Sequence, residues 1–160
     1  MKRIALLAML FVSALGYSQG SSNATATSNA IIVSPIKIES SQDLNFGKII
    51  GSATGGTVSI EASADATRTI DDDMNAPGST PTAAIFAVTA EAGQLYSVDV
   101  EASTLKADGQ TPMTLNPTTN LTETSISGNR TIYVGGALVV NANQVPDIYS
   151  GDVKVTVSYE

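Results

Sequence analysis

The sequence predicts an all-β protein, an immunoglobulin-like antiparallel β-sandwich of about eight strands, from three observations. Apolar and polar residues alternate repeatedly with a period of two, and no segment after the first 18 residues keeps the helical period near 3.6. Serine and threonine are abundant, whereas strong helix formers are scarce. Glycine, proline, asparagine and aspartate recur at short intervals, as turns between short strands require.

The first 18 residues predict a signal peptide. Lys2 and Arg3 precede an apolar run over residues 4–12, and small residues follow. The run is shorter than the roughly 20 residues that cross a bilayer, and no second run follows, so we expect no membrane insertion of the mature chain. We expect export to the periplasm, the outer cell surface or the extracellular medium. Three small residues offer cleavage sites, of which we prefer the second: Gly16, Ser18 and Gly20.

The mature chain is strongly acidic on this prediction. Removing Lys2 and Arg3 lowers the eight basic residues to six against 15 acidic ones, which gives a net charge of −9. Such a surface repels phosphate backbones, so we expect no nucleic-acid partner. Cysteine and histidine are absent from the sequence. Triads and metal sites built on them are therefore excluded, and we expect no cofactor, no metal and no enzymatic activity.

Three early runs predict strands. Residues 31–38 are rich in β-branched side chains and contain Pro35, which favours an edge strand or a bulge. Two shorter runs carry alternating apolar residues: Leu44 with Phe46, and Val58 with Ile60. Residues 62–81 and 105–112 collect aspartate, glycine and proline, so we predict loops there.

The middle of the chain predicts a hairpin. Residues 83–90 form one strand, and the alternating residues 96–103 form its partner with Tyr96 facing inward. The turn between them contains Gly93, which adopts a positive φ without strain.

Two further strands follow the hairpin. Met113 and Leu115 predict a short one. Residues 131–141 predict a long one, interrupted by a glycine pair that we interpret as a bulge or bend. Such a bulge changes the facing of the strand, so Tyr133 before it and two residues after it would reach the core: Leu138 and Val140.

The last strand shows the clearest alternation. Its polar residues share one face, and its apolar residues share the other: Val153, Val155, Val157 and Tyr159. One interpretation is an open sheet edge that pairs with another chain through these four residues. The other is an interior strand of a sandwich complete in itself.

Residues 19–30 predict a flexible N-terminal arm in front of a sandwich domain over residues 31–160. The arm is polar and small, and its few apolar residues of one parity continue into the domain: Ala24, Ala26, Ala30 and Ile32. These four would point the same way in a strand donated to another chain. The alternative is a disordered spacer, which is favoured because alanine methyl groups bury little area.

Three further groups each have a functional and a simpler interpretation. Residues 71–75 hold three adjacent aspartates suited to calcium, but a solvated acidic loop fits better because adjacent carboxylates converge poorly on one ion. Asp99 and Glu101 share a strand face and glycosidases use paired carboxylates, but exposed strand acids usually only add solubility. Tyr149 is the aromatic residue that we place on a loop, where it suits stacking on a sugar.

Several segments together resemble a known bacterial family. In chain order they are Ser34-Pro35-Ile36, residues 43–47, residues 55–58, residues 84–96, residues 134–138 and residues 149–159. Over about residues 30–160 the chain resembles the domain-of-unknown-function 4402 family. The C-terminal part of that family is similar to the spore coat U type domain of archaic chaperone–usher pilins. The resemblance implies an immunoglobulin-like sandwich that lacks one strand, which a neighbouring subunit's arm supplies.

From these observations we expect a secreted or surface structural protein. The specific hypothesis is a fimbria-like subunit assembled by β-strand complementation, with copies of itself or other surface subunits as partners. The alternative is a monomeric extracellular binding or adhesion module for a carbohydrate or surface ligand, with its site near residues 71–75 or Tyr149.

Overall fold

The computed structural model describes residues 20–71 and 73–160. This part holds ten strands and no α-helix, and so no helix that could cross a membrane. The predicted signal peptide, residues 1–18, lies outside the described residues. A compact unit extends from Val33 to Glu160, and residues 20–32 belong to a separate N-terminal unit without strands.

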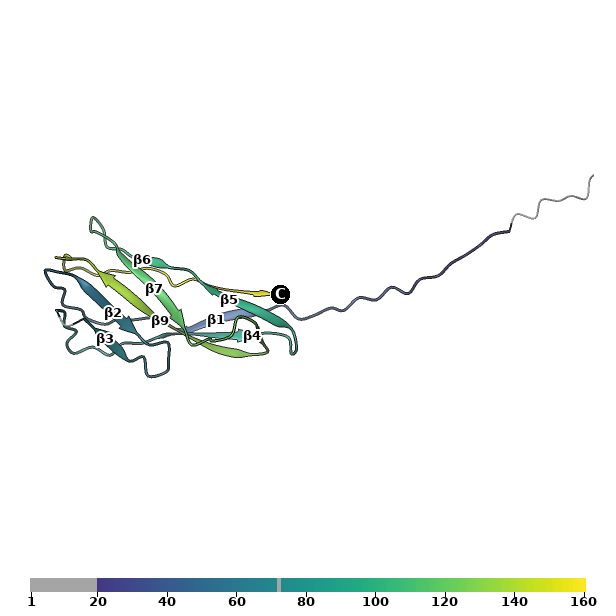
Figure 1. Cartoon of the computed structure of the whole chain (residues 1–160), viewed down its shortest axis with the longest axis horizontal. Coiled ribbons are helices and arrows are strands. Elements are labelled where there is room, and N and C mark those ends of the chain that lie inside the picture. The colour runs from purple at the N-terminus through teal and green to yellow at the C-terminus, as the bar shows by residue number, and fades with distance from the viewer. Residues whose placement is uncertain (1–19, 72) are drawn as a thin grey trace, which may run out of the picture. The chain divides into compact units, whose positions relative to one another are not determined.

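The strands form two antiparallel sheets of a β-sandwich, which confirms the predicted fold class (Figure 1). The larger sheet has the order β1-β4-β9-β2-β3, and β7 joins it by pairing with β9 and β6. The smaller sheet has the order β10-β5-β8. The bounds are β1 Lys37–Gln42, β2 Gly56–Ile60, β3 Arg68–Ile70, β4 Ala84–Thr89, β5 Leu95–Val100, β6 Ser103–Leu105, β7 Met113–Thr119, β8 Ile126–Ser127, β9 Arg130–Val140 and β10 Val155–Tyr159.

The long strand β9 organises the larger sheet. It pairs with β4 through residues 130–134, with β2 through residues 136–140 and with β7 through residues 134–139. The pairing with β7 continues without a shift across Gly135 and Gly136, so the predicted bulge is wrong. The facing does not change either, because Tyr133 is only partly buried while the buried side chains share one parity: Ile132, Val134, Leu138 and Val140.

The glycine pair of β9 allows the backbones to approach closely. A Cβ on Gly135 would collide with the Ile60 carbonyl oxygen and the Ala62 amide nitrogen. A Cβ on Gly136 would lie 2.7 Å from the Asn116 carbonyl oxygen. The pair therefore marks tight contact on the β2 and β7 sides rather than an irregular strand.

The predicted hairpin of β4 and β5 is wrong in its pairing, although both strands exist. β4 pairs with β1 and β9, whereas β5 pairs with β10 and β8, so the turn at Gly93 connects the two sheets. Tyr96 is fully buried as expected, and its hydroxyl donates to the Gly128 carbonyl oxygen at 3.0 Å. A chain that crosses between sheets at a turn leaves the same local pattern as a hairpin.

The first strand starts later than its sequence predicts. β1 begins at Lys37, beyond Pro35, and lies at the edge of its sheet as expected. The Leu44–Phe46 segment makes only an isolated bridge between Asn45 and Thr82. Residues 62–81 contain β3, which was predicted as loop, and the short strands β6 and β8 were not predicted. The strands predicted around Val58, Met113 and Val157 are confirmed as β2, β7 and β10.

Buried apolar side chains form two clusters, one toward each end of β9. The β2 cluster contains Phe46, Val58, Ile60, Ala66, Met74, Ala83, Met113, Leu115, Leu138 and Val140. The β5 cluster contains Ala84, Val88, Tyr96, Ile126, Ile132 and Val134. Partly buried apolar side chains are twice as many around the β5 cluster, twelve against six. The β5 cluster is therefore the less completely covered of the two.

Candidate interaction site: an open seam between two edge strands

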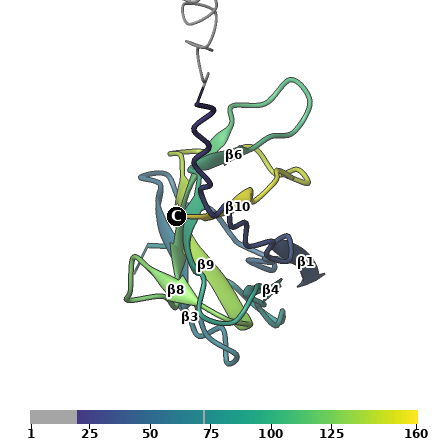
Figure 2. The ribbon, with the colours of Figure 1, turned by 90° about the vertical axis from the view of Figure 1, so that its right-hand side faces the viewer.

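β1 and β10 are edge strands of the two sheets (Figure 2), and we use the word seam for the side of the sandwich between their unpaired edges. β10 pairs only with β5, and β1 pairs only with β4. Within residues 20–71 and 73–160 no strand pairing joins β1 to β10. Each strand therefore presents one row of backbone N–H and C=O groups that no neighbouring strand satisfies.

The two edges of the seam run in opposite directions. At one end the Tyr159 hydroxyl donates to the Ser34 carbonyl oxygen at 3.1 Å and accepts from the Glu91 amide at 2.8 Å. At the other end Gln42, the last residue of β1, lines a groove of about 540 Å³ together with residues 149–153. β1 thus runs away from Tyr159, and the C-terminal segment runs toward it.

The interior of the seam is apolar and half covered. The predicted residues Val153, Val155, Val157 and Tyr159 all pack against the β5 cluster but remain partly exposed. Opposite them Ile36, Ile38 and Phe86 are partly buried in the same cluster. A further strand that covered these side chains would stabilise the sandwich by about 25 cal/mol for each Å² of apolar surface that it buried.

The other predicted interaction residues lie in the N-terminal arm. Ala24, Ala26 and Ala30 are exposed and belong to no strand. Ile31 and Ile32 are 90% and 96% exposed, which makes them the most exposed large apolar residues among the described residues. The arm therefore carries an exposed apolar pair at the end that joins the domain, and no charged residue occurs between residues 20 and 36.

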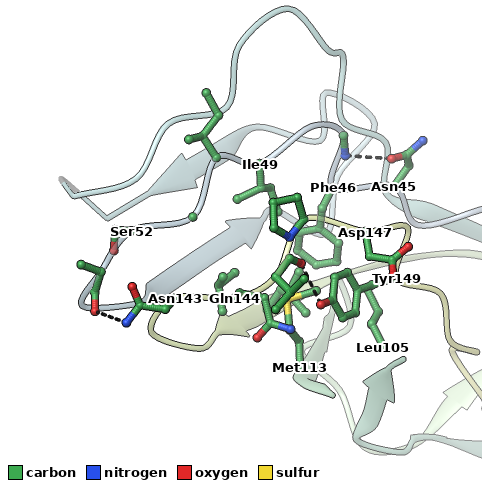
Figure 3. A pocket seen from close by; sticks show the side chains of 18 of the residues that line it. Asn45, Phe46, Ile49, Ser52, Leu105, Met113, Asn143, Gln144, Asp147 and Tyr149 are labelled. Atoms are coloured by element: carbon green, nitrogen blue, oxygen red, sulfur yellow. Dashed lines mark hydrogen bonds between the residues drawn. The ribbon is translucent and has the colours of Figure 1, made fainter. Parts of the chain in front are cut away.

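A cavity of about 620 Å³ opens at the Tyr149 end of the seam. Figure 3 shows the rings of Phe46 and Tyr149 with the side chains of Leu105 and Met113 around this space. The Tyr149 hydroxyl donates to the Val145 carbonyl oxygen at 2.9 Å, which ties the covering loop to the wall. The groove and the cavity lie next to each other, because they share five lining residues: Leu44, Asn45, Phe46, Leu105 and Tyr149.

Sequence reasoning identified only Tyr149 in this cavity. Its other walls come from four separate parts of the chain, around residues 44–53, 105–113, 138–140 and 143–147. The covering loop is held by side-chain bonds to distant backbone: Gln144 donates to the Thr111 carbonyl oxygen at 2.7 Å, and Asn141 donates to that of Pro112 at 3.0 Å. No local pattern predicts such long-range bonds.

The candidate acidic groups have ordinary structural partners. Asp71 accepts a hydrogen bond from the Thr57 amide at 2.7 Å, and Asp73 accepts one from the Thr54 hydroxyl at 3.1 Å. In the part of the chain that the structure describes, no three acidic side chains gather as metal ligands would. Glu101 forms an exposed ion pair with Lys154 at 2.7 Å. These contacts tie strands and turns together.

Two groups near the seam have shifted pKa values. Burial raises the pKa of Tyr96 above 10.0, Arg130 opposes this shift and Tyr159 adds to it. The hydrogen bond to Glu101 raises the pKa of Lys154 above 10.5, and the negative charges of Glu101 and Asp99 add to this. Tyr96 is therefore a neutral core residue at physiological pH, and Lys154 is a charged surface residue on the outer face of the C-terminal segment.

A family model described as Domain of unknown function (DUF4402) matches residues 36–159. The chain belongs to the DUF4402 family. No curated protein and no solved structure matches it. The matched range of this DUF4402 domain begins just before β1 and ends with β10, so both edges of the seam lie within the family domain. The arm precedes that range.

Proposed function

We propose that this DUF4402 chain is an exported, non-catalytic structural subunit of a fimbria-like polymer. A strand from another chain completes its sandwich by adding to the seam between β1 and β10. The observation that supports this proposal is the pair of opposed, unpaired strand edges over a half-covered apolar interior. The resemblance to pilin subunits that lack one strand points the same way.

Strand addition suits the seam energetically. An inserted strand would form backbone hydrogen bonds with both edges and would cover Val155 and Val157. Unprotected edges are a liability that proteins usually block with charges, prolines or bulges. The side chains of β10 that point into the seam carry no charge. β10 therefore lacks such protection, unlike β1, which has a bulge between Ser40 and Gln42, and this favours β10 as the edge that a partner pairs with.

The N-terminal arm of another copy is the occupant that we propose. It is extended, uncharged and exposed along residues 20–33, and it ends in the apolar pair Ile31–Ile32. In a monomer both isoleucines would remain in water. Insertion into the seam of another copy would bury one of them, because adjacent residues of a strand point to opposite faces. Other surface subunits with a similar arm are equivalent partners.

Sedimentation and thermal unfolding of residues 19–160 test the proposal, with and without a synthetic peptide of residues 19–38. We expect polymers, or a monomer whose melting temperature rises with peptide concentration. At 100 times the Kd the peptide would add about 2.7 kcal/mol to the free energy of unfolding. A peptide with Ala30→Asp and Ile32→Asp serves as the control and should have no effect. A stable monomer indifferent to both peptides would refute strand complementation.

A matched pair of variants tests which face of β10 is used. Val155→Asp with Val157→Asp places two charges in the seam and should abolish assembly and peptide binding, because buried unpaired charges are costly. Thr156→Asp with Ser158→Asp adds the same charges to the exposed outer face of the same strand and should leave both intact. Equal effects of the two pairs would show that the inner face is not the interface.

The cavity beside Tyr149 supports a second candidate function, a monomeric extracellular binding or adhesion module. Its size and its mixed apolar and polar walls suit a small ligand such as a sugar. This function predicts a monomer with one cooperative melt, which the sedimentation experiment distinguishes from the first proposal.

A further inference from the structure

The cavity beside Tyr149 has an apolar floor and carries a carboxylate and an aromatic ring at its rim. We infer that it binds a hydrophobic organic cation, an aryl or alkyl ammonium compound, with the apolar body on the floor and the cationic group between Tyr149 and Asp147. The inference rests on the second candidate function, the binding module, and names its ligand class. It does not depend on strand complementation.

Side chains of the β2 cluster make the floor of the cavity. Phe46, Met113, Leu138 and Val140 line it, and each is at most 6% exposed. The cavity volume of about 620 Å³ is within the range of small-molecule sites. A ligand gains affinity on such a floor by removing apolar surface from water, so its body must be apolar.

The polar side chains of the lining already bond to the protein. The Tyr149 hydroxyl donates to the Val145 carbonyl oxygen at 2.9 Å, and the Gln144 amide donates to the Thr111 carbonyl oxygen at 2.7 Å. Three further polar side chains of the lining bond to nearby backbone groups: Asn45, Ser52 and Asn143. A sugar would lose many hydrogen bonds to water on entering, so the cavity favours a ligand with few hydrogen-bonding groups.

The charge of the lining favours a cation. Among residues 20–71 and 73–160, Asp147 is the one charged residue that lines the cavity. Asp147 is exposed, so it lies at the rim, and its carboxylate is oriented by the Ile148 amide, which donates to it at 2.8 Å. The acidic surface of the whole chain attracts cations toward this rim and repels anions.

Aromatic rings add a second attraction for an organic cation. Figure 3 shows the rings of Phe46 and Tyr149 around the cavity. The face of such a ring attracts an ammonium group that lies within about 6 Å of its centre. Tyr149 packs against the β2 cluster and is tied to Val145, so its ring is in place before a ligand arrives.

A metal ion would suit this rim less well. Hard cations need several oxygen ligands from one site, and in the described part of the chain no three acidic side chains gather. One carboxylate beside an aromatic ring is sufficient for an ammonium group, which needs no ordered set of ligands. The cation therefore has to be organic, with an apolar body that reaches the floor.

A titration with three probes of similar shape tests the inference. Benzyltrimethylammonium is the cation, neopentylbenzene is its neutral isostere, and phenylacetate is an anion. We follow the amide NMR signals of residues 19–160 at physiological ionic strength. We expect the cation to shift the signals of residues 143–149 saturably, with a Kd of about 0.1–1 mM for a probe of about eleven non-hydrogen atoms. Phenylacetate should bind at least about tenfold more weakly.

Two aspartate variants test the carboxylate. Asp147→Asn keeps an oxygen that accepts from the Ile148 amide and should weaken binding of the cation about threefold, as the loss of an exposed ion pair does. Its affinity for neopentylbenzene should not change. Asp108→Asn is the control, because it removes the same charge from an exposed site outside the lining, and it should leave both affinities unchanged.

Two substitutions of Tyr149 test the ring. Tyr149→Phe and Tyr149→Leu both lose the bond to the Val145 carbonyl oxygen, so the two variants release the covering loop alike. Only the phenylalanine keeps an aromatic face. We expect the phenylalanine variant to bind the cation about fivefold more tightly than the leucine variant.

The outcomes separate the inference from both proposed functions. Saturable binding of neopentylbenzene without binding of the cation would keep the binding module and overturn its cationic ligand. Shifts spread over the acidic surface that grow without saturation would also overturn the inference, as would unchanged cation affinity in Asp147→Asn. Sedimentation of the same samples reports assembly separately. A stable monomer that binds the cation and ignores the 19–38 peptide would refute strand complementation and support the inference.

Discussion

Two nearly identical tetrapeptides of this chain occupy different kinds of position in the fold. Residues 57–60, Thr-Val-Ser-Ile, form most of β2, and residues 156–159, Thr-Val-Ser-Tyr, form most of β10. Val58 is 0% exposed because β9 and β3 flank its strand and the β2 cluster covers its side chain. Val157 packs on the β5 cluster but stays partly exposed, because β10 has a neighbour on one edge only.

Alternation along a strand specifies which face is apolar but not whether that face becomes fully covered. Coverage depends on the strands beside and opposite, which are distant in the sequence. β2 is complete within one chain, whereas β10 lacks a neighbour. The same substitution should therefore lower the free energy of unfolding by different amounts in β2 and in β10.

The largest effect is expected at the closed side, where the strands approach most tightly. Gly135→Ala would drive a Cβ into the backbone of Ile60 and Ala62, which cannot move without disturbing the β2–β9 pairing. We expect a loss of more than about 3 kcal/mol in the free energy of unfolding, at the upper end of overpacking effects. Denaturant unfolding of the purified variant measures this loss.

Gly93→Ala is the control for the Gly135 substitution. Gly93 has a φ of 80° and open space around it, so an added methyl group meets no atom. Only the left-handed backbone opposes the alanine, at about 1–2 kcal/mol. If the two variants lost equal stability, the close contact of β9 with β2 would not be the reason for the glycine.

Matched valine truncations measure the contrast between β2 and β10 directly. Val58→Ala should cost about 2 kcal/mol, the transfer of two methylene equivalents plus a residual cavity. Val157→Ala should cost less than about 1 kcal/mol in the isolated chain, because its side chain is only partly covered. Chemical denaturation of both variants under the same conditions gives the two values.

The 19–38 peptide should change the cost of the β10 truncation and leave the cost of the β2 truncation unchanged. When a strand covers the seam, Val157 gains neighbours, so the cost of Val157→Ala should rise toward that of Val58→Ala. The cost of Val58→Ala should stay constant with peptide. An unchanged Val157 value at saturating peptide would place the peptide elsewhere.

A smaller effect concerns Tyr96, the buried residue of β5 behind the seam. Its folded pKa is raised by burial, so the unfolded chain releases the hydroxyl proton first as the pH rises. The stability from Tyr96 is therefore full below pH 10.0 and is lost as pH increases through the folded pKa. Tyr96→Phe should lose about 1 kcal/mol at neutral pH with the bond to Gly128, and its stability should fall less steeply above pH 10.0.

Unfolding measured from pH 7 to 11 for the wild type and Tyr96→Phe checks this expectation. The difference between the two curves reports the contribution of Tyr96. Parallel curves would mean that Tyr96 does not carry the alkaline sensitivity.

The sequence predicts strands wherever alternation is local and uninterrupted, as at Val58, Met113 and Val157. It fails where pairing is decided by distant partners. β4 and β5 resemble a hairpin, yet the turn at Gly93 passes between sheets because both strands find better neighbours elsewhere. The Arg68 guanidinium stabilises β3 by donating to the carbonyl oxygens of Phe46 and Ala76 at 2.7 Å. No alternation in the sequence predicts this strand.

In the candidate site too, local features could be predicted from the sequence and long-range ones could not. The inward residues of β10 are readable from alternation alone, and the facing of Val155 and Val157 follows from it. The opposing edge could not be predicted from alternation, because β1 starts only after Pro35 and pairs with a strand more than 40 residues away. The cavity is built by four segments that meet only in the folded chain, so one aromatic residue on a loop was its single sequence signal.

The smallest effect is expected on the outer face of the C-terminal segment. Lys154 pairs with Glu101 at 2.7 Å, but both side chains are more than half exposed, at 65% and 52%. Solvent and salt screen such a pair, so Lys154→Gln should leave the melting temperature nearly unchanged. Its affinity for the 19–38 peptide should also be unchanged, because the residue points away from the seam. A peptide affinity that fell with Lys154→Gln as far as with Val157→Ala would show that the partner binds the outer face, and the difference between the two faces of the segment would then have no bearing on assembly.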